Sequence, residues 1–157
     1  MRTLRPWIPA LLWAVVIWLL STQEFSGFAT GRWILPALHW LLPQADAKTL
    51  LIVHTFIRKS AHFVEYFIFA SLLLRGIRRR QWGWKLRWGL ATLSVAACYA
   101  ALDELHQAFV PSRSASFYDT LIDIAGALAA VLLAWSSARR QTHRLERAAG
   151  AREAAPL

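Results

Sequence analysis

The sequence predicts an all-α integral membrane protein, a four-helix bundle with both termini in the cytoplasm. Its 157 residues are 57% hydrophobic and only 17% charged, and the mean hydropathy is +0.36. A soluble domain of this size would be less apolar and more heavily charged. Long apolar runs alternate with short segments rich in arginine. The length predicts a single domain.

Four apolar runs are candidates for membrane spans, at about 6–20, 60–74, 88–105 and 117–137. A span needs roughly 20 residues, with roughly 17 tolerated, so the first two runs are short. An earlier start of the second span would place Arg58 and Lys59 inside the membrane. We therefore interpret residues 49–57 as an interfacial segment that leads into that span.

Basic residues set the predicted orientation. They concentrate near the N-terminus, between the second and third spans, and after the fourth span. These regions share one side if all four spans cross, and the positive-inside rule assigns that side to the cytoplasm. Loops 21–57 and 108–116 then face outward. We interpret Arg78, Arg79 and Arg80 as topological residues only.

Residues 1–138 are predicted to form the membrane domain, followed by a basic cytoplasmic tail, 139–157. A cleaved signal peptide is the alternative interpretation of the first run. No Ala-x-Ala cleavage site follows it, so we interpret the run as an uncleaved helix.

The net charge of +9 does not indicate nucleic-acid binding, because the positive-inside rule accounts for the arginines. The nine tryptophans mostly lie near span ends, as membrane anchors do. The single Cys98 cannot form an internal disulfide. The expected partner is therefore the lipid bilayer.

Two polar segments, 58–66 and 103–113, adjoin apolar runs. Ionisable groups in lipid are costly unless they face a partner or a water-filled cavity. In the predicted topology both segments lie at the outer end of the spans, beside the first turns of the last one. We therefore expect one outward-facing polar pocket. Its candidate binding residues are Lys59, His62, Glu65, Tyr66, Asp103, Glu104, Gln107, Arg113, Asp119 and Asp123.

Helical spacing supports this pocket, because residues three or four apart share a face. Three stripes result: Lys59, His62 and Tyr66; Asp103, His106 and Gln107; Asp119, Asp123, Gly126 and Ala130. Small residues below the polar ones let helices approach closely. We expect Arg113 to pair with Asp119. His39 and His54 have no clear companions and are interpreted as ordinary loop residues.

Three functions are compatible with these residues. In the first, Lys59 and Arg113 hold the anionic headgroup of a lipid or a lipid-linked wall precursor. The alternative is an envelope-lipid enzyme in which His62, Glu104 and His106 bind a metal ion. A proton path through Asp123 is the third, but no ionisable residue continues it deeper into the last span. The residues identify no cofactor.

The order of the polar residues resembles the VanZ-like family of small bacterial membrane proteins. The resemblance covers about residues 58–130. The matching residues are Lys59, His62, Glu65 and Tyr66; then Asp103, Glu104 and Gln107 in an Asp-Glu-x-x-Gln pattern; then Phe109, Pro111 and Arg113 in a Phe-x-Pro-x-Arg loop; then Asp119, Asp123 and Gly126.

The resemblance implies a multi-pass protein of the bacterial inner membrane and an envelope function. The family takes its name from a member associated with low-level resistance to the glycopeptide teicoplanin. That antibiotic acts outside the membrane on a lipid-linked wall precursor. An outward-facing polar site would lie on the same side, so the resemblance implies a contribution to glycopeptide tolerance.

Overall fold

The computed structural model describes residues 4–79, 81–111, 113 and 116–153. This part of the chain is all-helical, with no strand, which confirms the predicted all-α class. Short 3-10 helices at Arg5–Trp7 and Gln23–Phe25 flank the first α-helix. The five α-helices are α1 (Ile8–Leu20), α2 (Gly27–Leu41), α3 (Ala47–Arg78), α4 (Leu86–Ala108) and α5 (Phe117–Glu153).

Side-chain caps set the start of two helices. The Ser26 hydroxyl accepts a hydrogen bond from the Ala29 backbone N–H at 3.2 Å and begins α2. The Asp46 carboxylate accepts one from the Thr49 N–H at 2.9 Å and begins α3. The same interaction lowers the pKa of Asp46. Each cap satisfies a backbone donor that the first helical turn leaves free.

The predicted interfacial segment at 49–57 and the predicted span at 60–74 form one helix. Both belong to α3, which is continuous for 32 residues, about 48 Å at 1.5 Å per residue, so the position of the membrane boundary along it stays a prediction. Arg58 and Lys59 lie within the helix, and both contact neighbouring elements. The Arg58 guanidinium lies against Gly27 of α2, and the Lys59 ammonium is paired with Asp119.

The outer loop predicted at 21–57 also contains a helix. α2 follows α1 after a sharp bend, and the axes of Arg5–Leu20 and Gln23–Leu41 differ by 73°. Phe28, Trp33 and Trp40 on α2 are strongly exposed. Aromatic residues on such a helix suit the boundary between water and lipid.

Two helices of the described chain are long and apolar enough to cross a membrane: Ala47–Arg78 and Phe117–Arg147. The bent pair at Arg5–Leu20 and Gln23–Leu41 gives a third if it is one span. Helix α4, predicted as a span, does not reach this level of hydropathy. Asp103 and Glu104 lower its hydropathy, as do its internal glycine, serine and threonine. The four-span topology therefore stays a prediction.

α3 is the central helix and packs against α1, α2, α4 and α5. Its core residues include Tyr66, Phe69 and Leu73, which lie three or four positions apart on one face. α4 and α5 present mostly alanines to this face, such as Ala100 and Ala127. Large residues on one helix thus pack against small residues on two others, which keeps the helices close.

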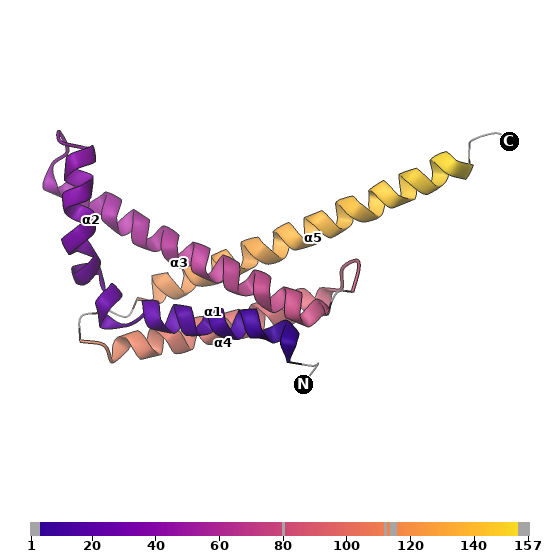
Figure 1. Ribbon diagram of the computed structural model, residues 1–157, viewed down its shortest axis with the longest axis horizontal. Coiled ribbons are helices and arrows are strands. Elements are labelled where there is room, and N and C mark those ends of the chain that lie inside the picture. The colour runs from indigo at the N-terminus through magenta and orange to yellow at the C-terminus, as the bar shows by residue number, and fades with distance from the viewer. Residues whose placement is uncertain (1–3, 80, 112, 114–115, 154–157) are drawn as a thin grey trace.

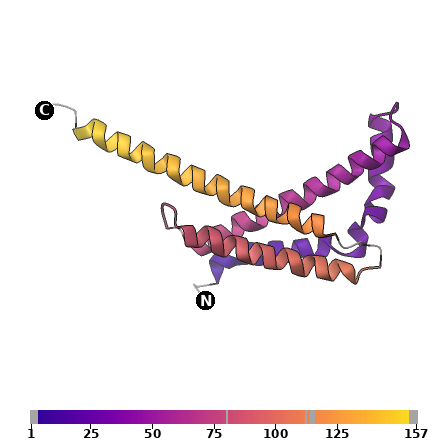
Figure 2. The same ribbon diagram turned by 180° about the vertical axis from the view of Figure 1, so that it is seen from behind.

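α3 and α5 cross and then diverge, and the end of α5 projects beyond the other helices (Figures 1 and 2). At the crossing, Gly126 lies against the Phe63 backbone. A Cβ atom on Gly126 would overlap the Phe63 carbonyl oxygen and lie 3.0 Å from its carbonyl carbon. Because real Cβ atoms essentially never come so close to other heavy atoms, this crossing requires glycine.

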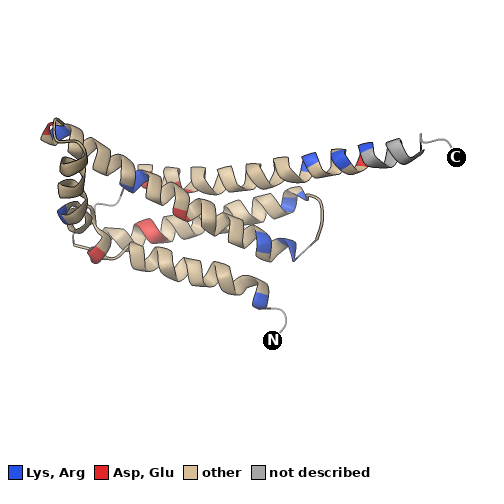
Figure 3. Cartoon of the chain, turned by 45° about the horizontal axis from the view of Figure 1, so that its top comes forward, with Lys and Arg blue, Asp and Glu red and all other residues tan. Residues whose placement is uncertain are grey.

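The N-terminal segment, the α3–α4 connection and the end of α5 lie toward one end of the molecule (Figure 1). We call this the basic end, because most lysines and arginines gather there and most acidic residues lie toward the opposite end (Figure 3). We call the opposite end, where α1 and α4 end and α5 begins, the polar end.

Candidate functional site at the polar end

Two polar contacts, one of them a salt bridge, join α3 to α5 at the polar end. The Lys59 ammonium lies 2.6 Å from an Asp119 carboxylate oxygen. His62 Nδ1 lies 3.2 Å from the Asp123 carboxylate. The Asp123 side chain is 1% exposed and that of His62 11%, so the second pair is secluded from water. The two predicted stripes on α3 and α5 therefore face each other.

A second polar group links α4 to the loop that follows it. The Gln107 side-chain amide donates to the Asp103 carboxylate at 2.8 Å, one turn away. The same amide lies 3.5 Å from the Ser21 hydroxyl at the end of α1. The Arg113 guanidinium donates to the side-chain amide oxygen of Gln107 at 3.3 Å. Asp103 and Gln107 are both buried, as their predicted stripe on α4 requires.

Arg113 holds the α4–α5 connection against the segment after α1. Its guanidinium donates to the backbone carbonyls of Leu20, Thr22 and Phe25. Burial lowers the pKa of Arg113, and Arg58 acts in the same direction, but arginine remains charged in proteins. The expected Arg113–Asp119 pair is wrong, because Asp119 binds Lys59. Carbonyl groups exposed where a helix ends are ready acceptors for such a cation.

Among the described residues, four buried side-chain nitrogen or oxygen atoms have no hydrogen-bond partner: Tyr66 Oη, Asp103 Oδ1, His106 Nδ1 and Arg113 Nε. Tyr66 is fully buried and Asp103 is 5% exposed. The rings of Tyr66 and Tyr99 lie 6.5 Å apart, and Tyr99 shares a face of α4 with Asp103. Both unpaired oxygens therefore belong to the α3–α4 interface.

Glu104 and His106 have structural partners. The Glu104 carboxylate accepts a hydrogen bond from the Ser116 backbone N–H and so binds the start of α5. The His106 ring stacks on Trp18 of α1, with centroids 5.4 Å apart. Within the described residues, no group of three histidine, cysteine or acidic side chains could hold a metal ion. The hypothesis that His62, Glu104 and His106 bind a metal therefore gains no support.

Sequence patterns did not identify several groups that position the site. The Trp13 indole N–H donates to the Glu65 backbone carbonyl at 2.9 Å, and the Glu65 side chain is half-buried beside the network. The Tyr99 hydroxyl donates to the Ala14 carbonyl at 2.6 Å. Both contacts join α1 to another helix across long sequence separations, where no local spacing can signal them.

His54 was expected to have no companion, and this is wrong. It is buried against α2, and its Nε2 lies 3.3 Å from the Thr30 hydroxyl. The two residues lie on α2 and α3, which pack against each other. The sequence did not predict α2, so this contact could not be expected. His39, by contrast, is exposed. His54 thus serves the packing of α2, outside the polar network.

The fold and this network define an all-helical membrane protein with interacting ionisable side chains buried between its helices. In comparisons with known families, the model of the VanZ/LLP1 family matches residues 6–138. This match covers most of the chain, and the protein therefore belongs to the VanZ/LLP1 family. In the same comparisons no curated protein and no solved structure matched the chain.

Proposed function

We propose that the polar end faces outward and binds the anionic headgroup of a lipid or of a lipid-linked wall precursor. The chain is then a four-span protein of the bacterial inner membrane with both termini in the cytoplasm. Holding such a headgroup at the outer leaflet would compete with antibiotics that bind it there. The proposed consequence is increased tolerance to glycopeptides of the teicoplanin type.

The unpaired buried oxygens of Tyr66 and Asp103 carry this proposal. A buried polar atom without a partner costs about 1–3 kcal/mol, which a headgroup admitted to the α3–α4 interface would recover by offering hydrogen bonds. Asp103 can accept a hydrogen bond, and Tyr66 can donate or accept one. The Lys59 side chain is 41% exposed, so its ammonium can bind an acidic group without leaving Asp119. A headgroup with both hydroxyl and acidic groups fits this combination.

The orientation predicts the side of each terminus. We expect reporters placed after Leu157 and inserted at Gly83 to be cytoplasmic. Gly83 suits an insertion because it lies in the α3–α4 connection, and nothing lies within 4 Å of a Cβ built there. Fusions of alkaline phosphatase and a fluorescent protein would measure the side. An external location of either reporter contradicts the proposed orientation.

The functional proposal predicts that Tyr66→Phe with Asp103→Asn abolishes any teicoplanin tolerance that the chain confers. Both changes keep the side-chain volume. Tyr66→Phe removes the hydroxyl group, and Asp103→Asn removes the negative charge. The measurement is teicoplanin susceptibility of a sensitive bacterium that expresses wild type or the double variant at equal membrane levels.

Tyr118→Phe with Glu24→Gln is the matched control, because it makes the same kinds of chemical change at exposed positions. This control should protect cells as well as wild type does. Equal protection by the Tyr66/Asp103 variant, or no protection by wild type, contradicts the proposed role.

A further inference from the structure

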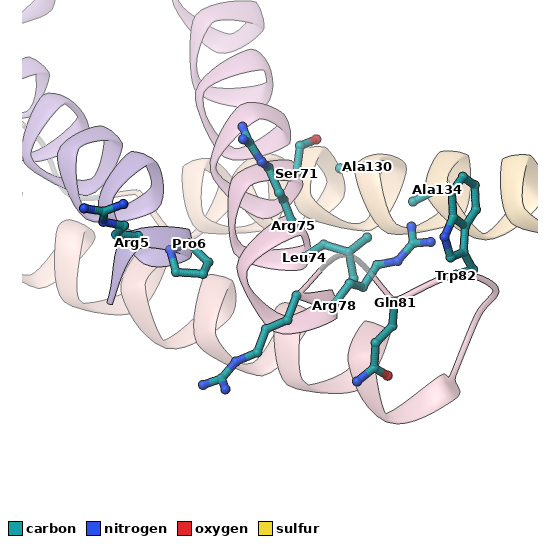
Figure 4. A pocket seen from close by; sticks show the side chains of 11 residues that line it. Arg5, Pro6, Ser71, Leu74, Arg75, Arg78, Gln81, Trp82, Ala130 and Ala134 are labelled. Carbon is teal, nitrogen blue, oxygen red and sulfur yellow. The ribbon is translucent and has the colours of Figure 1, made fainter. Parts of the chain in front are cut away.

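A second polar feature lies at the basic end and includes none of the polar-end residues. Beyond their crossing at Gly126, α3 and α5 diverge and leave a cavity of about 870 Å³. Figure 4 shows its lining side chains from the N-terminal segment, α3, the α3–α4 connection and α5. We call this cavity the basic groove, after the arginines that line it: Arg5, Arg75, Arg78 and Arg79.

The charge of the basic groove is of one sign, because no aspartate or glutamate is among its described lining residues. The positive-inside rule accounts for arginines at this end. It does not account for the fact that arginines of the N-terminal segment and of the end of α3 line one cavity. Four like charges around one cavity repel each other, and a bound anion would relieve that repulsion.

Arg78 is held at the basic groove by contacts with the α3–α4 connection and with α4. Its guanidinium donates to the Gly83 carbonyl at 2.9 Å and lies 5.7 Å from the centre of the Trp88 ring. These contacts fix a half-buried side chain, so less conformational freedom is lost when a ligand binds. Arginine binds phosphate through two parallel hydrogen bonds, which makes phosphate the best-matched anion.

The inner walls of the basic groove are apolar. Leu74 of α3 and Ala130 and Ala134 of α5 line it between the two helices. Ser71 and Gln81 add uncharged polar groups to the lining. A free phosphate would use the arginines alone, whereas a phospholipid would also place an acyl chain against the apolar wall. Cationic pockets of this kind between membrane helices bind lipid headgroups.

We propose that the basic groove binds an anionic phospholipid, with its phosphate on the arginines and an acyl chain between α3 and α5. In the topology proposed above, this site faces the cytoplasmic leaflet, where anionic lipids attract basic segments. Phospholipid binding at the basic groove depends neither on that orientation nor on the polar end.

Native mass spectrometry of the full-length protein in detergent tests this proposal with three probes: phosphatidylglycerol, phosphatidylcholine and inorganic phosphate. Wild type should bind phosphatidylglycerol at least about tenfold more tightly than phosphatidylcholine, a difference of about 1.4 kcal/mol. Excess inorganic phosphate should not displace the lipid. Displacement at millimolar phosphate would identify a free-anion site and overturn the lipid assignment.

Three variants locate the binding. Arg5→Gln with Arg75→Gln removes two exposed charges from the basic groove, and Ala134→Phe fills its wall while keeping every arginine. Each should weaken phosphatidylglycerol binding about tenfold or more. Arg139→Gln with Arg140→Gln removes the same charge from α5 outside the basic groove and should leave binding unchanged.

An equal loss in the Arg139/Arg140 control would show that net charge alone attracts the lipid. Unchanged binding by Ala134→Phe would show that the apolar wall is not occupied. Either result overturns the proposed site. Tryptophan-fluorescence melting curves for each variant confirm that the compared proteins are folded, and Ala134→Leu replaces Ala134→Phe if the larger side chain prevents folding.

Discussion

Replacing Gly126 by alanine is expected to destabilise the protein more than the addition of one methyl group at any other position. The added Cβ would overlap the Phe63 carbonyl oxygen where α3 and α5 cross. Backbone atoms cannot rotate away as a side chain does, so the helices must separate. Overpacking a dense interface costs about 1–3 kcal/mol, and occasionally more, and we expect the upper end of that range. Thermal unfolding in detergent, followed by tryptophan fluorescence, would measure it.

Ala125→Val is the matched control, because Ala125 is the preceding residue of α5 but is exposed. It should melt at the wild-type temperature. A wild-type melting temperature for Gly126→Ala would show that α3 and α5 do not cross in contact at Phe63. The separation of the helices by Gly126→Ala should also disrupt the polar end, because the same two helices carry Lys59, His62, Asp119 and Asp123.

The second large effect is expected at the pair formed by His62 and Asp123. Replacing His62 by alanine leaves the Asp123 carboxylate buried without its partner, and breaking a buried pair costs about 3–5 kcal/mol. Asp123→Ala should cost less, because an imidazole is easily neutral near pH 7, whereas a carboxylate must take up a proton. The double variant should cost clearly less than the sum of the two single changes, since the pair interacts directly.

His143 and Glu146 provide the matched control. They are separated by the same 3.2 Å, but both side chains are about two-thirds exposed. Exposed pairs of this kind contribute little, so Glu146→Ala should leave the melting temperature unchanged. Additive effects of the His62 and Asp123 variants would contradict the buried contact between α3 and α5.

Helical periodicity explains why much of the site could be predicted. Lys59, His62 and Tyr66 share a face because of their spacing, and so do Asp119 and Asp123. Burying these groups is costly unless they find partners, so the two faces are expected to meet. The contacts of Lys59 with Asp119 and of His62 with Asp123 confirm that they do. The all-helical class followed from composition for the same reason, since apolar segments in lipid must satisfy their backbone internally.

The errors arose where tertiary contacts decide the local structure. By sequence, Arg58 and Lys59 separate an interfacial segment from a span, yet α3 continues through them, and they lie beside Gly27 and Asp119. The partner of Arg113 was misassigned because the carbonyls it binds belong to residues about 90 positions earlier in the chain. The sequence also did not predict that Arg78 and Arg79 line a cavity, because that cavity forms only where α3 and α5 diverge.

The central claim is that the buried polar end binds a headgroup, and native mass spectrometry with a lipid-linked wall precursor tests it most directly. The full-length protein and its Tyr66→Phe/Asp103→Asn variant would be compared in the same detergent, after melting curves show that both are equally stable. We expect a precursor-sized adduct on wild type that is lost from the variant. Equal adducts on both proteins, or none on wild type at saturating precursor, would contradict the claim.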